Sequence, residues 1–280
     1  MSVPPAGIAD LHLRDSGTGE PLLLLHGLGG DHTVWNGPVG SLAGSFRVLA
    51  PDLRGHGRSP TPAGSTFGFN ELEEDLLALL DRLGLPSVHL AGASAGGFLA
   101  LRLALDQPHR VRSLMLLSTA AHTDGHTRSV VQHWTEVYRD QGFEAYVRRL
   151  LKDLYYAEFL EAHLELLDQA MVTLKDRDLR AAVQWGAAVK SFDVRPRLGR
   201  LAVRTLVLHG MEDRVIDASH ARVLRQAIRG AELKLFPYAG HLLPVERPEE
   251  VAQMIRGWAT AAEGARAAGS GAVPEGERGV

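Results

Sequence analysis

The sequence predicts an α/β protein with a mostly parallel central sheet and helices on both faces of that sheet. Short apolar runs alternate along the chain with longer stretches of helical period, which is the pattern of such a fold. Hydrophobic residues make up 45% of the 280 residues and charged residues 22%. This composition is ordinary for a globular protein, so the chain can bury a substantial core.

Six of the apolar runs have the length of buried strands, and helical period fills the stretches between them. The segment before them, Ile8–Arg14, has apolar residues on alternate positions, and we expect it to lie antiparallel at one edge of the sheet. The predicted strands are Pro21–Leu25, Arg47–Ala50, Val88–Ala91, Ser113–Leu117, Thr205–Leu208 and Leu233–Phe236, and the predicted helices are Phe69–Leu83, Ala95–Asp106, Ser219–Ile228 and Pro248–Ala262.

The alternation is interrupted once, between residues 122 and 192. This segment has helix-period sequence without a convincing strand, and it lies between two strands of the predicted sheet. Such an insertion is typical of a lid or cap over the strand ends. We therefore predict a core formed by residues 1–121 and 193–263 and a helical cap formed by residues 122–192. Helices within the cap are predicted at Val131–Tyr138, Tyr146–Leu154 and Phe159–Leu174.

The two ends of the chain and its longest apolar runs bear on disorder and on targeting. Residues 264–280 are rich in Gly, Ala and Glu with almost no large apolar residue, which predicts a disordered tail. Met1–Gly7 has no basic region followed by an apolar core, so it is not predicted as a signal peptide. The longest dense apolar runs, Leu22–Leu25 and Leu114–Leu117, are far shorter than the roughly 20 residues that span a bilayer. We expect a cytoplasmic protein with no membrane partner.

Charge and cysteine content limit the possible partners and cofactors. The formal net charge is −3 and the basic residues are scattered, so no nucleic-acid partner is expected. Cysteine is absent, which excludes disulfides and thiolate chemistry. His122 and His126 are four residues apart, but the sequence between them is typical of a loop, and no H-E-x-x-H occurs. The prediction is therefore no metal and no cofactor, and the oligomeric state stays open.

A G-x-S-x-G motif, Gly92–Gly96, joins a predicted strand directly to a predicted helix. In such a turn the serine has a strained backbone, and its hydroxyl projects clear of the sheet. The strand and helix approach so closely that side chains at Gly92 and Gly96 would collide. The amide of Ala95 is left free at the start of the helix, where it can stabilise developing negative charge. This context predicts that Ser94 is a nucleophile; the alternative is a glycine-rich turn whose serine only caps the helix.

A serine hydroxyl needs a base to accept its proton. The chain contains 13 histidines, so the base has to be chosen by its position relative to the predicted strands. Functional loops in this kind of sheet follow the carboxyl ends of the strands. His241 comes directly after the last predicted strand and before the last predicted helix, which predicts that it is the base. A loop histidine without a role is the alternative.

The supporting acid is expected after the preceding strand, which gives the chain order serine, acid, histidine. Asp213 lies in the segment that follows the predicted strand Thr205–Leu208. Glu212 and Asp217 are close competitors, and spacing alone separates Glu212 from Asp213 poorly. From the residues alone, the choice among the three carboxylates stays open.

Five motifs follow one another in order along the chain: His26-Gly27 after a strand, Asp52–Ser59, Gly92–Gly96, Gly210-x-x-Asp213 and Gly240-His241. With them the chain resembles the α/β-hydrolase family, in particular its esterases, lactonases and C–C bond hydrolases. The resemblance runs from Pro21 to about Trp258 and implies the α/β-hydrolase fold. It also implies that Asp213 is the acid and that the amide of Leu28 is a second oxyanion donor beside Ala95.

Some positions depart from patterns within the family. Asp217 stands where members commonly have proline, so a second carboxylate could help Asp213 to orient His241. Ala93 precedes the nucleophile where C–C bond hydrolases often have asparagine, which weakens that interpretation. Epoxide hydrolases and haloalkane dehalogenases are similar but have aspartate at the position of Ser94. Five cap aromatics either line a substrate pocket or form the cap core, namely Trp134, Tyr138, Tyr155, Tyr156 and Trp185.

The resemblance and the motifs together imply hydrolysis of a small-molecule carboxylic ester or lactone. Ser94 would attack the carbonyl, His241 would move the proton, and Asp213 would orient His241. Two enzymatic alternatives stay open, a C–C bond hydrolase acting on a vinylogous diketone and a perhydrolase. A non-catalytic ligand receptor is a further alternative, because a fold does not fix a function.

Overall fold

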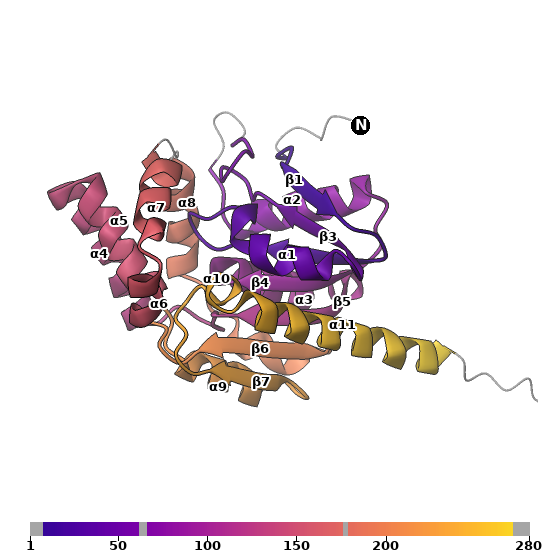
Figure 1. Ribbon diagram of the computed structural model, residues 1–280. Helices are drawn as coiled ribbons and strands as arrows, with labels where there is room; N and C mark the ends of the chain where they lie inside the picture. The colour runs from indigo at the N-terminus through magenta and orange to yellow at the C-terminus, as the bar shows by residue number, and fades with distance from the viewer. Residues whose placement is uncertain (1–7, 62–65, 176–178, 271–280) are drawn as a thin grey trace, which may run out of the picture.

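The computed structural model describes residues 8–61, 66–175 and 179–270. It contains a seven-stranded sheet in the order β1-β3-β2-β4-β5-β6-β7, in which β1 is antiparallel to β3 and all other neighbours are parallel (Figure 1). The predicted fold class is therefore confirmed. The strands are β1 (Leu13–Ser16), β2 (Glu20–Leu25), β3 (Phe46–Pro51), β4 (Val88–Ala93), β5 (Val111–Leu117), β6 (Thr205–Gly210) and β7 (Glu232–Phe236).

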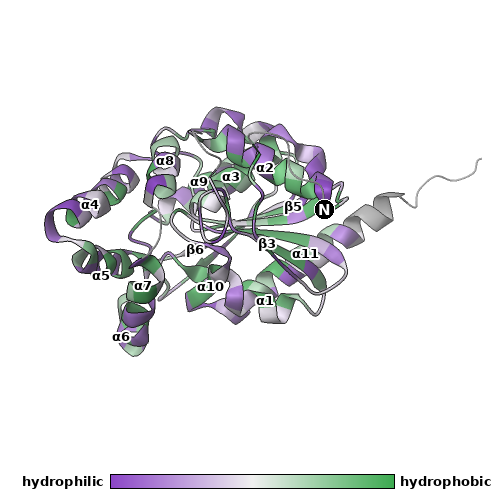
Figure 2. Cartoon of the chain, turned by 90° about the horizontal axis from the view of Figure 1, so that it is seen from above, coloured by the Kyte–Doolittle hydropathy of each residue, from purple (hydrophilic) through white to green (hydrophobic). Residues whose placement is uncertain are grey.

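Helices cover both faces of the sheet, and each face has its own apolar core (Figures 1 and 2). Successive side chains of a strand point to opposite faces, so Leu23 and Leu25 of β2 join one core while Leu22 and Leu24 join the other. The first core is covered by α2 (Phe69–Arg82), α3 (Ala95–Asp106) and α9 (Ser219–Ala227), and the second by α1 (Asn36–Leu42) and α11 (Pro248–Ser270). The short helices are η1 (His32–Trp35), η2 (Pro108–Arg110), η3 (Arg195–Arg200) and α10 (Leu243–Glu246).

Among the described residues, five α-helices lie between β5 and η3, and we call residues 122–192, which contain them, the insertion. Its two ends meet, because His122 forms an isolated antiparallel bridge with Asp193, and the N–H of Thr123 donates to the carbonyl of Phe192 at 3.0 Å. Figure 1 shows these helices gathered beside one end of the sheet. They are α4 (Gly125–Gln141), α5 (Phe143–Leu154), α6 (Ala157–Ala162), α7 (Glu165–Lys175) and α8 (Leu179–Lys190).

Three elements differ from the sequence prediction. The edge strand is β1 rather than Ile8–Arg14. Ala9 and Leu11 are buried as expected, but the N–H of Ala9 donates to the side chain of Asp75 and is therefore not part of the hydrogen bonds between strands. The predicted helix Phe159–Leu174 is divided into α6 and α7. The tail predicted as disordered from Gly264 is helical as far as Ser270, since α11 continues through its alanine-rich sequence, and residues 271–280 lie outside the described residues.

The helices also bear on the prediction about membranes. Within the described ranges, no helix combines the length and the apolar character that crossing a bilayer requires.

Candidate active site

Ser94 lies between the end of β4 and the start of α3 with φ 54° and ψ −124°. Positive φ is strained for a residue other than glycine, and such strain is often found at functional turns. The neighbouring glycines make the turn possible. A β-carbon on Gly92 would lie 2.3 Å from the carbonyl oxygen of Gly96, and one on Gly96 would lie 2.4 Å from that of His26. The strand and helix thus touch where the sequence predicts a collision for any side chain.

The side chains of Ser94, His241 and Asp213, which we call the triad residues, meet beyond the carboxyl ends of β4, β6 and β7. Ser94 Oγ is 2.8 Å from His241 Nε2, and His241 Nδ1 is 2.7 Å from Asp213 Oδ2. A carboxylate only accepts hydrogen bonds, so Nδ1 carries the proton and Nε2 is left to accept from the Ser94 hydroxyl. His241 and Asp213 are buried and Ser94 is partly exposed, which leaves the hydroxyl as the accessible group.

Asp213 is held as a carboxylate by four donors. Its Oδ1 accepts the backbone N–H groups of Val215 and Ile216, both at 2.9 Å. Burial alone would raise the pKa of Asp213, but the neighbouring ring of His241 and the hydrogen bonds from His209 and His241 outweigh burial and hold that pKa far below its usual range. Asp213 therefore stays ionised and can stabilise a positive charge on His241.

His209, at the end of β6, is a second imidazole on Asp213 that the sequence analysis missed. Its Nε2 is 2.8 Å from the carbonyl oxygen of Ile216 and 3.2 Å from Asp213 Oδ2. Because a carbonyl oxygen can only accept, Nε2 of His209 carries a proton that it shares between the two oxygens. The signal available in the sequence was a histidine at the carboxyl end of a buried strand, four residues before the acid.

The competing carboxylates lie elsewhere. Asp217 accepts the N–H of Ser219 at 2.8 Å and so caps the start of α9. The side chain of Glu212 is exposed to solvent. The carboxylate within hydrogen-bonding distance of His241 is that of Asp213.

The loop after β2 lies against Ser94. A β-carbon on Gly27 would be 2.9 Å from Cβ and 3.3 Å from Oγ of Ser94, which places the next residue, Leu28, beside the hydroxyl. Ala95 is the first residue of α3, so its N–H has no partner within the helix. Over the described part of the chain, neither Leu28 nor Ala95 donates its N–H to a backbone carbonyl. Leu28 adjoins Gly27, and Ala95 adjoins Ser94, so both predicted oxyanion donors belong to segments that border the nucleophile.

His26 fixes this loop from below. Its ring is fully buried, its Nε2 accepts the N–H of Leu53 at 2.9 Å, and its Nδ1 donates to the carbonyl of Gly27 at 2.8 Å. Burial, helped by the nearby ring of His56, lowers the pKa of His26 to about 3. The histidine is therefore neutral over the range in which most proteins work.

We expect acid to destabilise the protein through His26. In the unfolded chain a histidine takes up a proton near pH 6.5, whereas in the folded protein His26 does so near pH 3. Between these values the unfolded state binds the extra proton, so the stabilisation present above pH 6.5 is lost as the pH falls. Between pH 7 and pH 4 this amounts to about 3 kcal/mol at 1.36 kcal/mol per pKa unit. Urea unfolding at the two pH values measures it.

The matched variant is His26→Gln, which is polar but does not titrate. Its free energy of unfolding should fall by about 3 kcal/mol less than that of the wild type between pH 7 and pH 4. Equal losses in the two proteins would show that His26 does not carry the acid sensitivity.

The five aromatic residues of the insertion occupy different environments. Trp185 is fully buried, and the edges of the His26 and His56 rings meet it at centroid distances of 6.3 and 5.3 Å. Tyr155 is buried and stacks on another ring of the insertion, whereas Tyr138 is 44% exposed. Trp185 therefore packs behind the loop that contains Leu28. The two remaining aromatics, Trp134 and Tyr156, are partly buried.

The two histidines considered as metal ligands point to different partners. The ring of His122 packs on His220 at 5.0 Å, and Nε2 of His126 donates to the carbonyl of Arg214 at 2.9 Å. Within residues 8–61, 66–175 and 179–270, the group of side chains close enough to share a metal ion is a different one, formed by His12, His32 and Asp52.

That group is a closed set of hydrogen bonds. Asp52 Oδ1 accepts the backbone N–H and the ring Nδ1–H of His32 at 2.8 and 2.7 Å, while Oδ2 accepts from His12 Nδ1 at 3.0 Å and from the N–H of Arg58 at 2.9 Å. The guanidinium of Arg58 lies 3.2 Å from His12 Nε2. Because donors occupy these positions, the group is explained as an anchor for the turn after β3.

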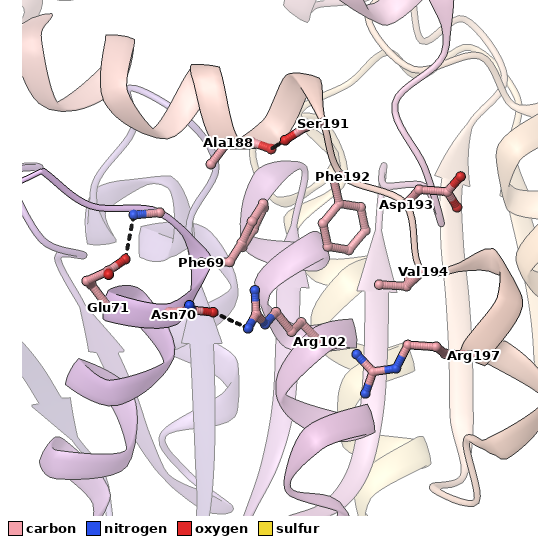
Figure 3. Close-up of a pocket in the computed structure, with 11 residues that line it drawn as sticks. Phe69, Asn70, Glu71, Arg102, Ala188, Ser191, Phe192, Asp193, Val194 and Arg197 are labelled. Atoms are coloured by element: carbon pink, nitrogen blue, oxygen red, sulfur yellow. Dashed lines mark hydrogen bonds between the residues drawn. The ribbon is translucent and has the colours of Figure 1, made fainter.

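A cavity of about 460 Å³ lies where the insertion rejoins the core (Figure 3). Arg102 and Arg197 line it, but both guanidinium groups pair with the carboxylate of Asp106. None of the triad residues lines this cavity. The candidate active site is therefore the surroundings of Ser94.

Comparison with known proteins finds similar hydrolases. The chain is 31% identical over 229 residues to a candidate carbamate hydrolase, RutD, of Variovorax paradoxus, covering 80% of this chain and 85% of that protein. It is 33% identical over 272 residues to a 2-hydroxymuconate semialdehyde hydrolase of Pseudomonas putida, covering 90% and 91%. The crystal structure of the enol-lactonase of Burkholderia xenovorans superposes with a TM-score of 0.82 at 28% identity, covering 90% of this chain and 97% of the other.

The same relationship is seen at the level of the family. Residues 20–248 match the family model described as alpha/beta hydrolase fold, a range that includes β2 to β7 and all three triad residues. This chain therefore belongs to the alpha/beta hydrolase fold family.

Proposed function

We propose that the protein is a serine hydrolase that cleaves a small carboxylic ester or lactone through an acyl-enzyme. The observation that carries the proposal is the continuous hydrogen-bonded chain from the Ser94 hydroxyl through His241 to Asp213. The similarity to an enol-lactonase over nine tenths of the chain supports a substrate of this class.

In the first half of the reaction Ser94 Oγ attacks the carbonyl carbon, and its proton passes to His241 Nε2. The N–H groups of Leu28 and Ala95 stabilise the resulting oxyanion, and each such donor typically contributes about 3 kcal/mol. When the C–O bond breaks, the leaving alcohol takes the proton from Nε2. In the second half, water attacks the acyl carbon while His241 accepts its proton, and the acid leaves as Ser94 Oγ regains a proton.

We also propose that the insertion acts as a cap over this chemistry. Its helix α8 packs on the loop with the proposed oxyanion donor, since a β-carbon on Gly186 would be 3.6 Å from Cδ2 of Leu28. Its helix α5 contacts the loop with His241, whose N–H donates to the carbonyl of Leu154 at 2.8 Å. A segment in contact with both loops is well placed to shape the substrate space and exclude water.

The test has two parts. A fluorophosphonate probe should label wild-type protein and leave the Ser94→Ala variant unlabelled, whereas a non-catalytic receptor would show no labelling in either. A panel of p-nitrophenyl esters, lactones, ring-cleavage diketones and a short acid with peroxide should then give the highest kcat/KM for an ester or a lactone.

A second candidate is a C–C bond hydrolase of a vinylogous diketone. The observation in its favour is the 33% identity to a 2-hydroxymuconate semialdehyde hydrolase over 90% of the chain. Turnover of ring-cleavage diketones well above that of esters in the same panel would replace the first proposal by this one.

The fit of the Leu28 loop gives a further prediction. Gly27→Ala should lower kcat by about 10²-fold, because the new β-carbon would meet Ser94 Cβ at 2.9 Å and displace the nucleophile from its attack position. Gly40→Ala is the control, since a β-carbon there meets nothing within 4 Å. Steady-state rates with p-nitrophenyl acetate measure both variants, and a Gly27→Ala rate equal to that of the control would contradict the expected displacement.

A further inference from the structure

The loop that contains His241 is bonded to the end of helix α5, a contact between the insertion and the core. The carbonyl of Leu154, the last residue of α5, accepts the N–H of His241 at 2.8 Å and that of Leu242 at 3.3 Å. The last carbonyls of a helix have no partner within the helix, so this oxygen is free to accept both. The backbone of the proposed base is thus held by a residue of the insertion.

A buried carboxylate completes the contact. Glu246 is 4% exposed, and its two oxygens accept the N–H of Gly240 at 2.9 and 3.1 Å. One of the oxygens also accepts the N–H of Tyr156, just after α5, at 3.1 Å. Burying a carboxylate is unfavourable unless it is hydrogen-bonded, and burial raises the pKa of Glu246. The side chain therefore bridges Gly240, the residue before His241, and Tyr156, the second residue after the end of α5.

The two segments also fit tightly. A β-carbon on Gly240 would lie 2.7 Å from the nitrogen of Tyr156, 2.8 Å from the carbonyl carbon of Tyr155 and 3.0 Å from the oxygen of Leu154. All three are backbone atoms, so they cannot move aside by a side-chain rotation. Any side chain at Gly240 would act as a wedge between the insertion and the His241 loop.

We infer that Glu246 is a positioning residue for His241, and that with the end of α5 it makes the insertion part of the apparatus that aligns the base with Ser94. The inference rests on the proposed function. Neither Glu246 nor Leu154 takes part in the proton transfers. Each instead fixes the backbone on which the imidazole is mounted, and a displacement of about 1 Å in such a group is typically enough to lower turnover by about 10²-fold.

The test compares three variants of this contact with two controls. Glu246→Ala removes both acceptor oxygens, and Glu246→Gln keeps one of them. Gly240→Ala places a methyl group against the backbone that follows α5. Glu73→Ala is the matched control, because Glu73 is also a buried carboxylate whose pKa is raised by burial, but it lies on α2 and pairs with Arg102 of α3. The control for the glycine is Gly257→Ala, where a β-carbon meets nothing within 4 Å.

Glu246→Ala and Gly240→Ala should lower kcat for p-nitrophenyl acetate by about 10²-fold with a smaller change in KM. Glu246→Gln should recover at least part of this loss. The rate of fluorophosphonate labelling should fall in parallel, while both controls should keep wild-type rates even if they unfold at lower temperature. Circular dichroism checks the fold of each variant. If one of the three does not fold, the comparison is made with the other two.

Proton NMR gives a readout that does not depend on activity. The hydrogen bond from His241 Nδ1–H to Asp213 predicts a downfield resonance in the wild type, which should broaden or vanish in Glu246→Ala and persist in Glu73→Ala. Folded Glu246 and Gly240 variants with wild-type kcat, labelling rate and downfield resonance would overturn the inference. Absence of labelling in the wild type would instead overturn the proposed function, while the resonance would still report whether Glu246 positions the ring.

Discussion

Replacement of Ser94 by alanine is expected to lower turnover of an ester by about 10⁶-fold, the loss typical of removing a triad serine. The reason is that Ser94 Oγ is the group that His241 Nε2 contacts at 2.8 Å, and alanine leaves no nucleophile at the turn between β4 and α3. The fold should survive, because alanine needs no more space than serine at this partly exposed position. Initial rates with p-nitrophenyl acetate measure the loss, and circular dichroism checks the fold.

A folded Ser94→Ala variant that still turns over an ester within tenfold of the wild-type rate would remove Ser94 from the reaction. Fluorophosphonate labelling of that variant would identify the residue that reacts instead.

The second large effect is expected for Asp213→Asn, which should reduce turnover by about 10⁴-fold. The oxygen of an asparagine would remain with the N–H groups of Val215 and Ile216, since these need an acceptor. Its NH₂ group would then face His241 Nδ1 and force that nitrogen to accept. The proton would move to Nε2, which could no longer accept from Ser94. Measuring kcat/KM for a simple ester across the neutral pH range tests this.

Asp217→Asn is the control for this variant, because Asp217 caps the start of α9 through Ser219. Its activity should stay within a few-fold of wild type, since the Oδ1 of asparagine can still accept the N–H of Ser219, and asparagine caps a helix about as well as aspartate. A loss below tenfold in Asp213→Asn together with a large loss in Asp217→Asn would transfer the orienting role to Asp217.

Ser94, His241 and the region of Asp213 could be singled out because the sequence places each of them in a segment that follows a predicted strand. In a parallel sheet the carboxyl ends of the strands lie at one edge, so residues far apart along the chain meet there. Asp213 could not be separated from Glu212 by spacing. The structure distinguishes them, since two backbone donors and two imidazoles surround Asp213, whereas the Glu212 side chain is exposed to solvent.

Other contacts had no sequence signal because they depend on tertiary packing. Glu246 lies on α10, and its partner Tyr156 is 90 residues away along the chain. It bonds only to backbone N–H groups, which every non-proline residue offers, so no residue type marks the partner. The edge strand was misplaced for a related reason. Ala9 and Leu11 have the alternating burial of a strand, but the N–H of Ala9 is taken by Asp75 of α2.

The closed base of the insertion has a consequence for how the length of this segment can vary. His122 and Asp193 are paired, so the five helices between them leave and re-enter the core at a single point. A segment whose ends are already together can vary in length at little entropic cost, about 0.6 kcal/mol for each doubling. With the insertion as the proposed cap, residues 122–192 could therefore be exchanged as one unit, provided that the replacement again presents a carbonyl to His241, an N–H to Glu246 and apolar side chains in place of Trp185 and Val189.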